Sequence, residues 1–186
     1  MCIRKDTAMK NVLIISTSLR KNSNSEMLAD YFAKGAEESG NNVEKVTLVG
    51  KNIAFCKGCL ACQKLGKCVI NDDANEITEK MLHADVVVFA TPIYYYEMSG
   101  QMKTLIDRAN SLFPKDYAFR DVYLLASAAE DEAGTIDGAV KGISGWVECF
   151  PKSRLAGTVF AGGVNDPGDI KGSPALEKAY KAGKNV

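Results

Sequence analysis

The 186-residue sequence has no surplus of either charge, because 23 Lys and Arg residues balance 23 Asp and Glu residues. A nucleic-acid-binding domain usually carries a basic surplus, so nucleic acid is not an expected partner. Long apolar runs are also missing, and none approaches the roughly 20 residues of a membrane span. The polar stretch 1–10 precedes too short an apolar run for a secretory signal. We therefore expect a cytoplasmic protein without a membrane partner.

Histidine is nearly absent, since His83 is the only one, and we interpret it as a surface or helix-end residue. Two phosphate-binding motifs are missing as well. The glycines of a dinucleotide fingerprint and the lysine of a P-loop do not follow the first predicted strand, Asn11–Ser16. These absences exclude the two commonest motif-defined nucleotide sites.

Apolar runs alternate with helical periodicity along the whole chain, which favours one domain over residues 1–186 with residues 1–10 as an extension. We expect a three-layer α/β fold with a doubly wound, parallel five-stranded sheet in the order 2-1-3-4-5. The expected strands are Asn11–Ser16, Asn42–Val49, Asp85–Thr91, Asp121–Ala129 and Arg154–Ala161. The expected helices are Asn24–Ser39, Asp73–His83, Gly100–Phe113, Gly134–Phe150 and one opened by Ser173 and Pro174.

The loop after the first strand is rich in hydroxyl groups and leads into a helix N-terminus. Such a loop offers hydroxyl and backbone N–H donors to an anion, aided by the helix dipole. The opposing interpretation is a polar turn that only caps the helix. The candidate phosphate ligands are Ser18, Arg20, Ser23, Asn24 and Ser25.

The loop after the third strand is aromatic and begins with a proline. A flat aromatic ligand needs a wall of this kind, with backbone polar groups for its edge. The alternative is that the tyrosines pack against the sheet or a subunit interface, and for Tyr96 the two interpretations carry equal weight, since only one or two rings can face a ligand here. The candidate ring contacts are Pro92, Ile93, Tyr94 and Tyr95.

Together the two loops resemble the flavodoxin-like NAD(P)H-dependent FMN reductase superfamily. The resemblance covers nearly the whole chain from Asn11 and is carried by residues 18–25, 91–94, 99–103 and 106–108. It implies a flavodoxin-like fold, FMN as cofactor, NAD(P)H as cosubstrate and a homodimer or homotetramer. It also implies a third flavin loop at Ser127, where this chain lacks the usual glycines. We interpret Asp107 and Arg108 as charges that tie their helix to the sheet.

Four of the six cysteines, Cys56, Cys59, Cys62 and Cys68, lie within a thirteen-residue window of an insertion over residues 50–73. Their spacing resembles bacterial ferredoxin ligation and the iron–sulfur flavoprotein branch of the same superfamily. A [4Fe–4S] cluster, a zinc ion and a metal-free set of thiols all remain open, because thiolates alone do not select the metal. We expect the four sulfur atoms to converge on one site near the flavin.

The leading functional hypothesis is an oxidoreductase that passes hydride from NAD(P)H through FMN to a small acceptor. The acceptor would be a quinone, a nitro or azo compound, a flavin or a metal ion, and no catalytic side chain is required. The alternative is an iron–sulfur flavoprotein that exchanges single electrons with a ferredoxin-like partner, docked on Lys57, Lys64 and Lys67. A zinc-stabilised interaction module is the third hypothesis.

Overall fold

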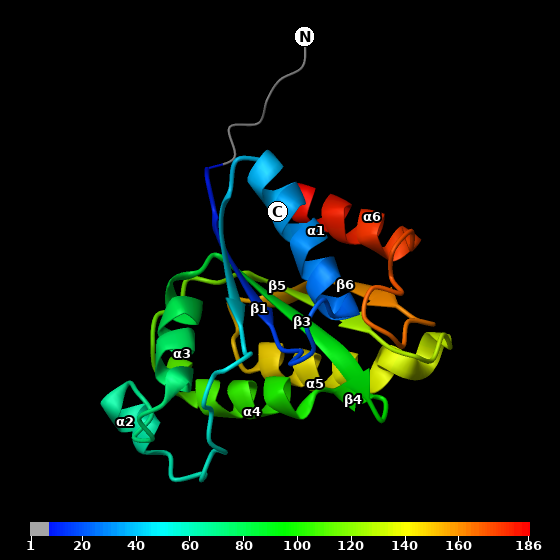
Figure 1. Cartoon of the computed structure of the whole chain (residues 1–186). Coiled ribbons are helices and arrows are strands. Elements are labelled where there is room, and N and C mark those ends of the chain that lie inside the picture. Colours follow the sequence, from blue (N-terminus) through cyan, green and yellow to red (C-terminus); the bar gives the residue numbers. More distant parts are fainter. Residues whose placement is uncertain (1–7) are drawn as a thin grey trace.

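The computed structural model describes residues 8–186, which form a parallel sheet with helices on both faces (Figure 1). The strands are β1 Asn11–Ser16, β2 Asn42–Thr47, β3 Val86–Tyr94, β4 Glu97–Met98, β5 Asp121–Ser127 and β6 Arg154–Ala161. The helices are α1 Asn24–Glu38, α2 Ala61–Leu65, α3 Asp73–His83, α4 Gly100–Arg108, α5 Asp137–Glu148 and α6 Pro174–Lys184, with 3₁₀ turns η1 Ala109–Leu112 and η2 Ala133–Ile136.

The parallel strands follow the order β2-β1-β3-β5-β6, and β4 pairs only with β3. Because β4 lies off the main path, this order is the predicted 2-1-3-4-5, and the flavodoxin-like architecture is confirmed. From β1 the chain adds β2 on one side and then crosses over to add β3, β5 and β6 on the other side, so the order of connection reverses between β1 and β3. In such folds the loops that leave these two strands form a crevice where ligands bind.

Two apolar clusters sandwich the sheet. Val12 and Ile14 face α1 and α6, whereas Leu13 and Ile15 face α3, α4 and α5. This alternation is the two-residue period of a strand whose faces are both covered by helices. The covering helices are amphipathic, so their apolar stripes close both faces.

Helices α1 and α6 approach until their backbones touch. A Cβ atom at Gly183 would lie 2.0 Å from the carbonyl oxygen of Phe32, and one at Gly35 would lie 2.1 Å from that of Tyr180. Only glycine fits at such a distance. The contact fixes the axis of α1, and hence the position of its N-terminus at the carboxyl edge of the sheet.

Several predicted boundaries differ from the structure. The helix expected over Gly100–Phe113 ends at Arg108 and tightens into η1. The strand expected over Asn42–Val49 stops at Thr47. The third strand extends beyond Thr91 to Tyr94 and returns as β4 through a turn at Tyr95 and Tyr96, both with positive φ. Sequence reasoning missed this hairpin, because such turns normally use Asn and Gly.

Candidate functional site

Buried hydroxyl groups join the loops that leave β1 and β3. The backbone N–H of Thr17 donates to the carbonyl oxygen of Ala90 at 2.9 Å. The Ser99 hydroxyl lies 3.1 Å from the hydroxyls of both Thr17 and Thr91, and it accepts from the N–H of Met102 as the cap of α4. This buried network fixes the two loops relative to each other.

The N-terminus of α1 provides donors at the same edge of the sheet. The Ser23 hydroxyl caps the helix by accepting from the N–H of Glu26 at 3.2 Å. The N–H groups of Asn24 and Ser25 belong to the first turn, where no intrahelical acceptor exists. Within residues 8–186 the buried hydroxyl of Ser25 has no hydrogen-bond partner. An unpaired buried hydroxyl beside a helix N-terminus fits an anionic ligand.

These groups line a cavity of about 150 Å³ at the carboxyl ends of the strands. All of the predicted cofactor residues except Tyr95 contribute to its wall: Ser18, Arg20, Ser23, Asn24, Ser25, Pro92, Ile93, Tyr94 and Ser127. The structure therefore brings three separate loops of the sequence together. The fully exposed side chain of Tyr95 lies outside the cavity.

The side chains of two predicted phosphate ligands, Asn24 and Arg20, donate hydrogen bonds to the loop after β6. The Asn24 amide donates to the carbonyl oxygens of Val164 and Asp166, and its oxygen accepts from the N–H groups of Gly168 and Ile170. Arg20 donates to the carbonyl oxygen of Asn165 at 2.9 Å. The side chain of Asn24 thus anchors the loop after β6, and only its backbone N–H remains for a ligand.

Sequence reasoning missed the loop after β6 and part of the loop after β5. Ala128, Ala129, Val164, Asn165 and Pro167 line the cavity. The N–H of Val164 donates to the carbonyl oxygen of Ala128 at 2.9 Å, which joins the two loops. The turn-forming run at 165–168 directly after the last strand was the available signal, because ligands bind beyond the carboxyl ends of parallel strands.

The cysteine insertion lies beside α3 and the α4–η1 junction, and its sulfur atoms differ in exposure. Cys56 and Cys59 are exposed, Cys68 is half-buried, and Cys62 is buried. The sulfur of Cys56 accepts from the N–H of Gly58, and that of Cys62 accepts from the amide of Asn110, both at 3.4 Å.

The four sulfur atoms do not converge in this structure. Among residues 8–186, no three Cys, His, Asp or Glu side chains come together closely enough to hold one metal ion. The donor set still suits a soft metal or a cluster, because four thiols lie within one short segment that includes α2. Binding one metal with all four would require this open loop to close.

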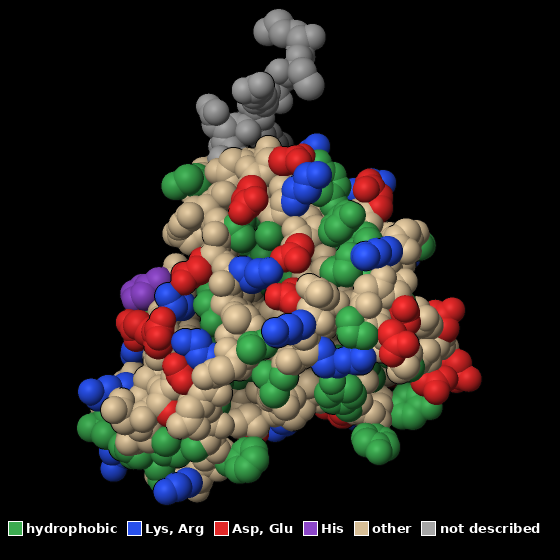
Figure 2. Space-filling model, in the orientation of Figure 1, with side chains coloured by type: hydrophobic (Ala, Val, Ile, Leu, Met, Phe, Trp, Pro, Cys, Tyr) green, Lys and Arg blue, Asp and Glu red, His purple; other side chains and the backbone are tan. Residues whose placement is uncertain are grey.

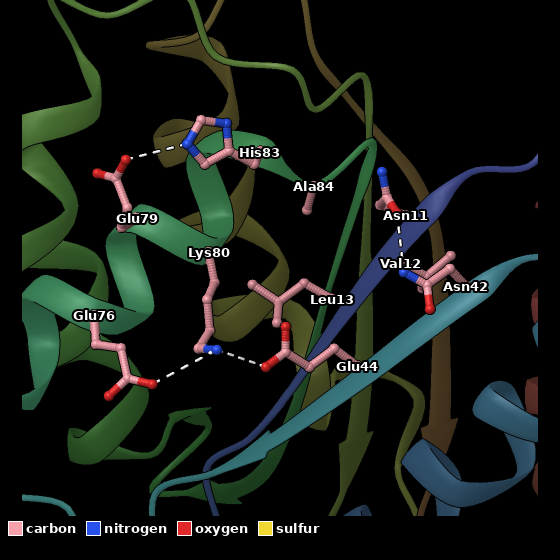
Figure 3. A pocket seen from close by; sticks show the side chains of 10 residues that line it. All are labelled: Asn11, Val12, Leu13, Asn42, Glu44, Glu76, Glu79, Lys80, His83 and Ala84. Carbon is pink, nitrogen blue, oxygen red and sulfur yellow. Dashed lines mark hydrogen bonds and ion pairs between the residues drawn. The ribbon is translucent and has the colours of Figure 1, made fainter.

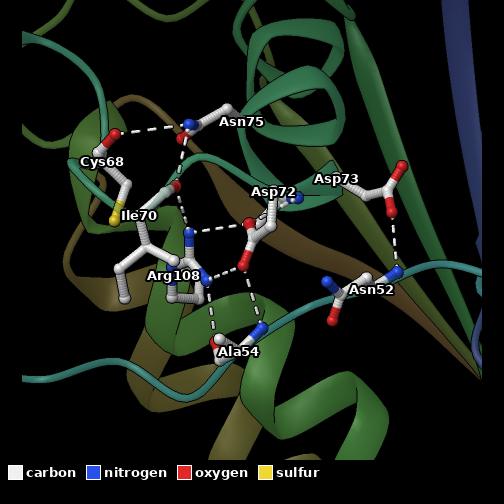
Figure 4. Close-up of polar contacts among 9 residues, drawn as sticks. Asn52, Ala54, Cys68, Ile70, Asp72, Asp73, Asn75 and Arg108 are labelled. Carbon is white, nitrogen blue, oxygen red and sulfur yellow. Dashed lines mark hydrogen bonds and ion pairs between the residues drawn. The ribbon is translucent and has the colours of Figure 1, made fainter.

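Arg108 connects the insertion to α4 (Figure 4). It forms a bidentate pair with Asp72, with N···O distances of 2.6 and 2.8 Å, and both side chains are almost fully buried. Burial raises the pKa of Asp72, but hydrogen bonds from Arg108 and from the N–H groups of Ala54 and Ala74 outweigh it, so that the net pKa is lowered. Asp72 also caps α3 by accepting from the N–H of Ala74. Arg108 therefore ties its helix to the insertion, and the predicted tie to the sheet is wrong.

A larger cavity, about 520 Å³, lies at the opposite edge of the sheet, between α3 and the first residues of β1 and β2 (Figure 3). Its charged groups pair with one another: Lys80 with Glu44 at 2.6 Å, and His83 with Glu79 at 3.1 Å. These mutually satisfied groups lie at the amino ends of the strands, away from the ligand edge of such folds.

A flavodoxin-like sheet with free donors at a helix N-terminus beside its switch point is typical of proteins that bind a phosphate-bearing cofactor. The family described as NADPH-dependent FMN reductase matches residues 10–147. The chain belongs to this family, and its relatives place it in the iron–sulfur flavoprotein branch. The predicted family is thereby confirmed.

Two curated relatives are named iron–sulfur flavoprotein. The one from Methanosarcina thermophila is 32% identical over 164 residues, which cover 88% of this chain and 83% of that protein. The one from Archaeoglobus fulgidus is 42% identical over 100 residues, 54% of this chain. That match spans only 45% of the length of the A. fulgidus protein.

Among solved structures, the NAD(P)H:quinone oxidoreductase from Methanothermobacter marburgensis superimposes with a TM-score of 0.78, at 20% identity, over 96% of both chains. An azoreductase from Bacillus anthracis gives a TM-score of 0.72 at 19% identity, over 96% of this chain and all of that one. At such identities the likeness shows the fold alone. No helix within residues 8–186 combines the length and apolar character needed to cross a membrane.

Proposed function

We propose that this protein is an FMN-dependent NAD(P)H oxidoreductase. The observation that carries the proposal is the unpaired buried hydroxyl of Ser25, beside the N–H groups that open α1, inside a cavity at the switch point. These neutral donors suit a phosphate group, which accepts several hydrogen bonds at once. Family membership supports FMN as the bearer of that phosphate.

Different sides of the cavity would contact different parts of the cofactor. Ser18, Ser25 and the N–H of Asn24 would hold the phosphate, while Pro92–Tyr94 and Ser127–Ala129 would flank the rest of the cofactor. At about 150 Å³ the cavity is smaller than a typical complete cofactor pocket, so it matches the phosphate end. A bound flavin supplies hydride acceptance and electron transfer, so no side chain has to act as acid or base.

The test starts from flavin-free protein. FMN should restore a yellow complex with one flavin per chain, and NADH or NADPH should bleach it under anaerobic conditions. A small acceptor such as a quinone should then restore the colour at a rate consistent with turnover. Protein that binds no FMN, or whose bound FMN neither nucleotide bleaches, would reject the proposal.

A second candidate function is single-electron exchange with a ferredoxin-like partner through a cluster on Cys56, Cys59, Cys62 and Cys68. Residues 51–71 contain lysines but no Asp or Glu, and Lys57, Lys64 and Lys67 are exposed. The view in Figure 2 shows positive and apolar side chains over this lower-left region and acidic ones at the far right. A positive surface around the thiols favours an acidic protein partner.

The second candidate is tested by composition. Protein produced and reconstituted without oxygen should contain about four iron and four acid-labile sulfide per chain. One zinc per chain, or four titratable thiols without metal, would reject the cluster and leave the FMN proposal intact.

We also propose a cytoplasmic homodimer or homotetramer. The oligomer is supported by the exposed aromatic residues Phe55, Tyr94, Tyr95 and Tyr96. Light scattering after gel filtration tests the oligomeric state.

A further inference from the structure

Arg108 is one of the largest fully buried side chains among the described residues, and all of its recorded partners lie in or beside the cysteine insertion. One terminal nitrogen, Nη1, donates to the carbonyl oxygen of Ala54 at 2.8 Å. The other, Nη2, donates to that of Ile70 at 3.0 Å. Ala54 lies two positions before Cys56, and Ile70 lies two positions after Cys68. A single guanidinium group therefore holds both ends of the cysteine motif by hydrogen bonds (Figure 4).

Asp72 binds both the guanidinium of Arg108 and the first end of the motif. Its carboxylate receives both terminal nitrogens of Arg108, and it also accepts from the N–H of Ala54 at 2.9 Å. Asn75 of α3 donates to the carbonyl oxygens of Cys68 and Ile70. A buried ion pair of this kind adds little net stability over apolar packing, so its geometry is the stronger reason for its presence.

The segment between the two held ends has little buried surface, since Cys62 is the only buried residue within 55–69. Gly58, Leu60 and Gly66 all have positive φ, and most of the side chains there are exposed. Cys62 is buried and Cys68 half-buried: Asn110 donates to the sulfur of Cys62, and Asn75 donates to the carbonyl oxygen of Cys68. Cys56 and Cys59 occupy the exposed half.

We infer that Arg108 is a positioning residue for the thiolate site: it fixes both ends of the cysteine loop before metal arrives. Cys62 and Cys68 then form the preset half of the site, and the loop closes Cys56 and Cys59 onto the metal. This inference rests on the proposed use of the four cysteines as ligands. Only Arg108 satisfies the geometry, because lysine cannot donate two parallel hydrogen bonds to Asp72 and also reach both carbonyl oxygens.

The test uses Co²⁺ as a probe, with the full-length, reduced, FMN-loaded protein under anaerobic conditions. Cobalt–thiolate charge-transfer bands report how many sulfur atoms bind, and titration reports affinity. Arg108→Lys should weaken Co²⁺ binding at least about tenfold and lower the charge-transfer intensity per bound ion. Its FMN affinity should stay within about twofold of wild type, because the two sites are separate. Lys103→Gln, at an exposed position of the same helix, is the control and should match wild type.

Equal affinity and band intensity in Arg108→Lys and wild type would overturn the inference while leaving the thiolate site standing. If wild type bound no Co²⁺, the site itself would be rejected, and the inference with it. Hydrogen exchange on metal-free wild type provides a measurement that does not depend on the variant folding. The N–H groups of Asn52 and Ala54, which donate to Asp73 and Asp72, should already be protected. Free exchange at both would show that the ends are not held, and would also overturn the inference.

Discussion

The cavity beside α1 and the cysteine insertion both follow strands at the carboxyl edge of the sheet, yet they are built in opposite ways. The cavity wall contains buried groups such as Ser18, Ser23 and Ser25, which are fixed by strand ends and a helix N-terminus. The insertion exposes Cys56 and Cys59 and is attached through its ends. The strands and helix α1 fix the groups of the cavity directly. The insertion, in contrast, is attached to the rest of the protein through the buried ion pair between Arg108 and Asp72.

This difference predicts which substitutions act on which region. A change that moves α1 should reach the cavity through the fold, because the helix N-terminus carries the donors. A change at Asp72 or Arg108 should loosen the insertion and leave the cavity intact. Sites without shared partners respond independently, so separate effects are the expected result.

The largest effect should come from Gly183→Ala. The new Cβ would lie 2.0 Å from the Phe32 carbonyl oxygen, and backbone atoms cannot move aside as a side-chain end can. Overpacking of this kind should cost about 3 kcal/mol or more of the free energy of unfolding, measured in urea. Gly145→Ala is the control, since nothing lies within 4 Å of its Cβ position, and it should be neutral or stabilising. Equal stability of the two variants would refute the close contact between the helices.

Asn24→Ala should cost about 2–3 kcal/mol, because it removes the side chain that satisfies backbone groups of residues 164–170. The loss should appear in flavin-free protein, which distinguishes an anchoring role from a phosphate ligand. If flavin-free Asn24→Ala were as stable as wild type and bound FMN more weakly, the role predicted from sequence would be correct. Thermal unfolding with and without FMN makes the comparison.

Ser25→Ala should separate binding from stability. Loss of a hydrogen bond to a charged group costs about 1.5–3 kcal/mol, so FMN affinity should fall by about 10- to 150-fold. Flavin-free protein should keep its stability or gain some, because the hydroxyl of Ser25 has no partner among residues 8–186. Ser23→Ala is the contrast: it removes a helix cap and should cost about 1 kcal/mol without ligand. Unchanged FMN affinity in Ser25→Ala would reject the phosphate assignment.

Acid should loosen the insertion through Asp72. Since the folded state lowers the pKa of this carboxyl, the folded form binds fewer protons than the unfolded form. Its stabilising contribution is complete above the ordinary pKa of 3.8 and is lost as pH falls through the lowered value. The protection factor of the Ala54 N–H against hydrogen exchange should therefore fall below about pH 4. Asp72→Asn should remove this pH step, and a step that persists in the variant would assign it to another group.

The parts of the molecule that the sequence predicted depend on neighbouring residues. Strand periodicity, helical periodicity and the hydroxyl-rich loop can each be recognised within a few neighbouring positions, so they were enough to predict the fold and most of the cavity wall. The role of Asn24 could not, because its partner Val164 lies 140 positions away along the chain. The same limit applies to Arg108, whose partner Asp72 lies 36 positions away.

The hairpin between β3 and β4 could not be predicted for a different reason: its residues do not favour the backbone conformation that they adopt. Tyr95 and Tyr96 favour extended backbone, yet the two-residue turn between β3 and β4 holds both at positive φ. Packing overrides that preference: Gly138 of α5 approaches so closely that a Cβ there would lie 2.4 Å from the Tyr96 carbonyl oxygen. The residues of the turn do not indicate that Gly138, 42 positions after Tyr96 along the chain, packs against it.

The smallest expected effect tests this hairpin. Tyr95→Asn should raise the free energy of unfolding by up to about 1 kcal/mol, because asparagine tolerates positive φ better than tyrosine does. No packing is lost, since the Tyr95 side chain is 100% exposed. FMN affinity should stay within about twofold of wild type, because Tyr95 does not line the cavity, whereas Tyr94→Ala should lower it. Urea unfolding and flavin titration measure the two effects. An equal loss of affinity in both variants would return Tyr95 to the ring-binding role that its sequence position predicts.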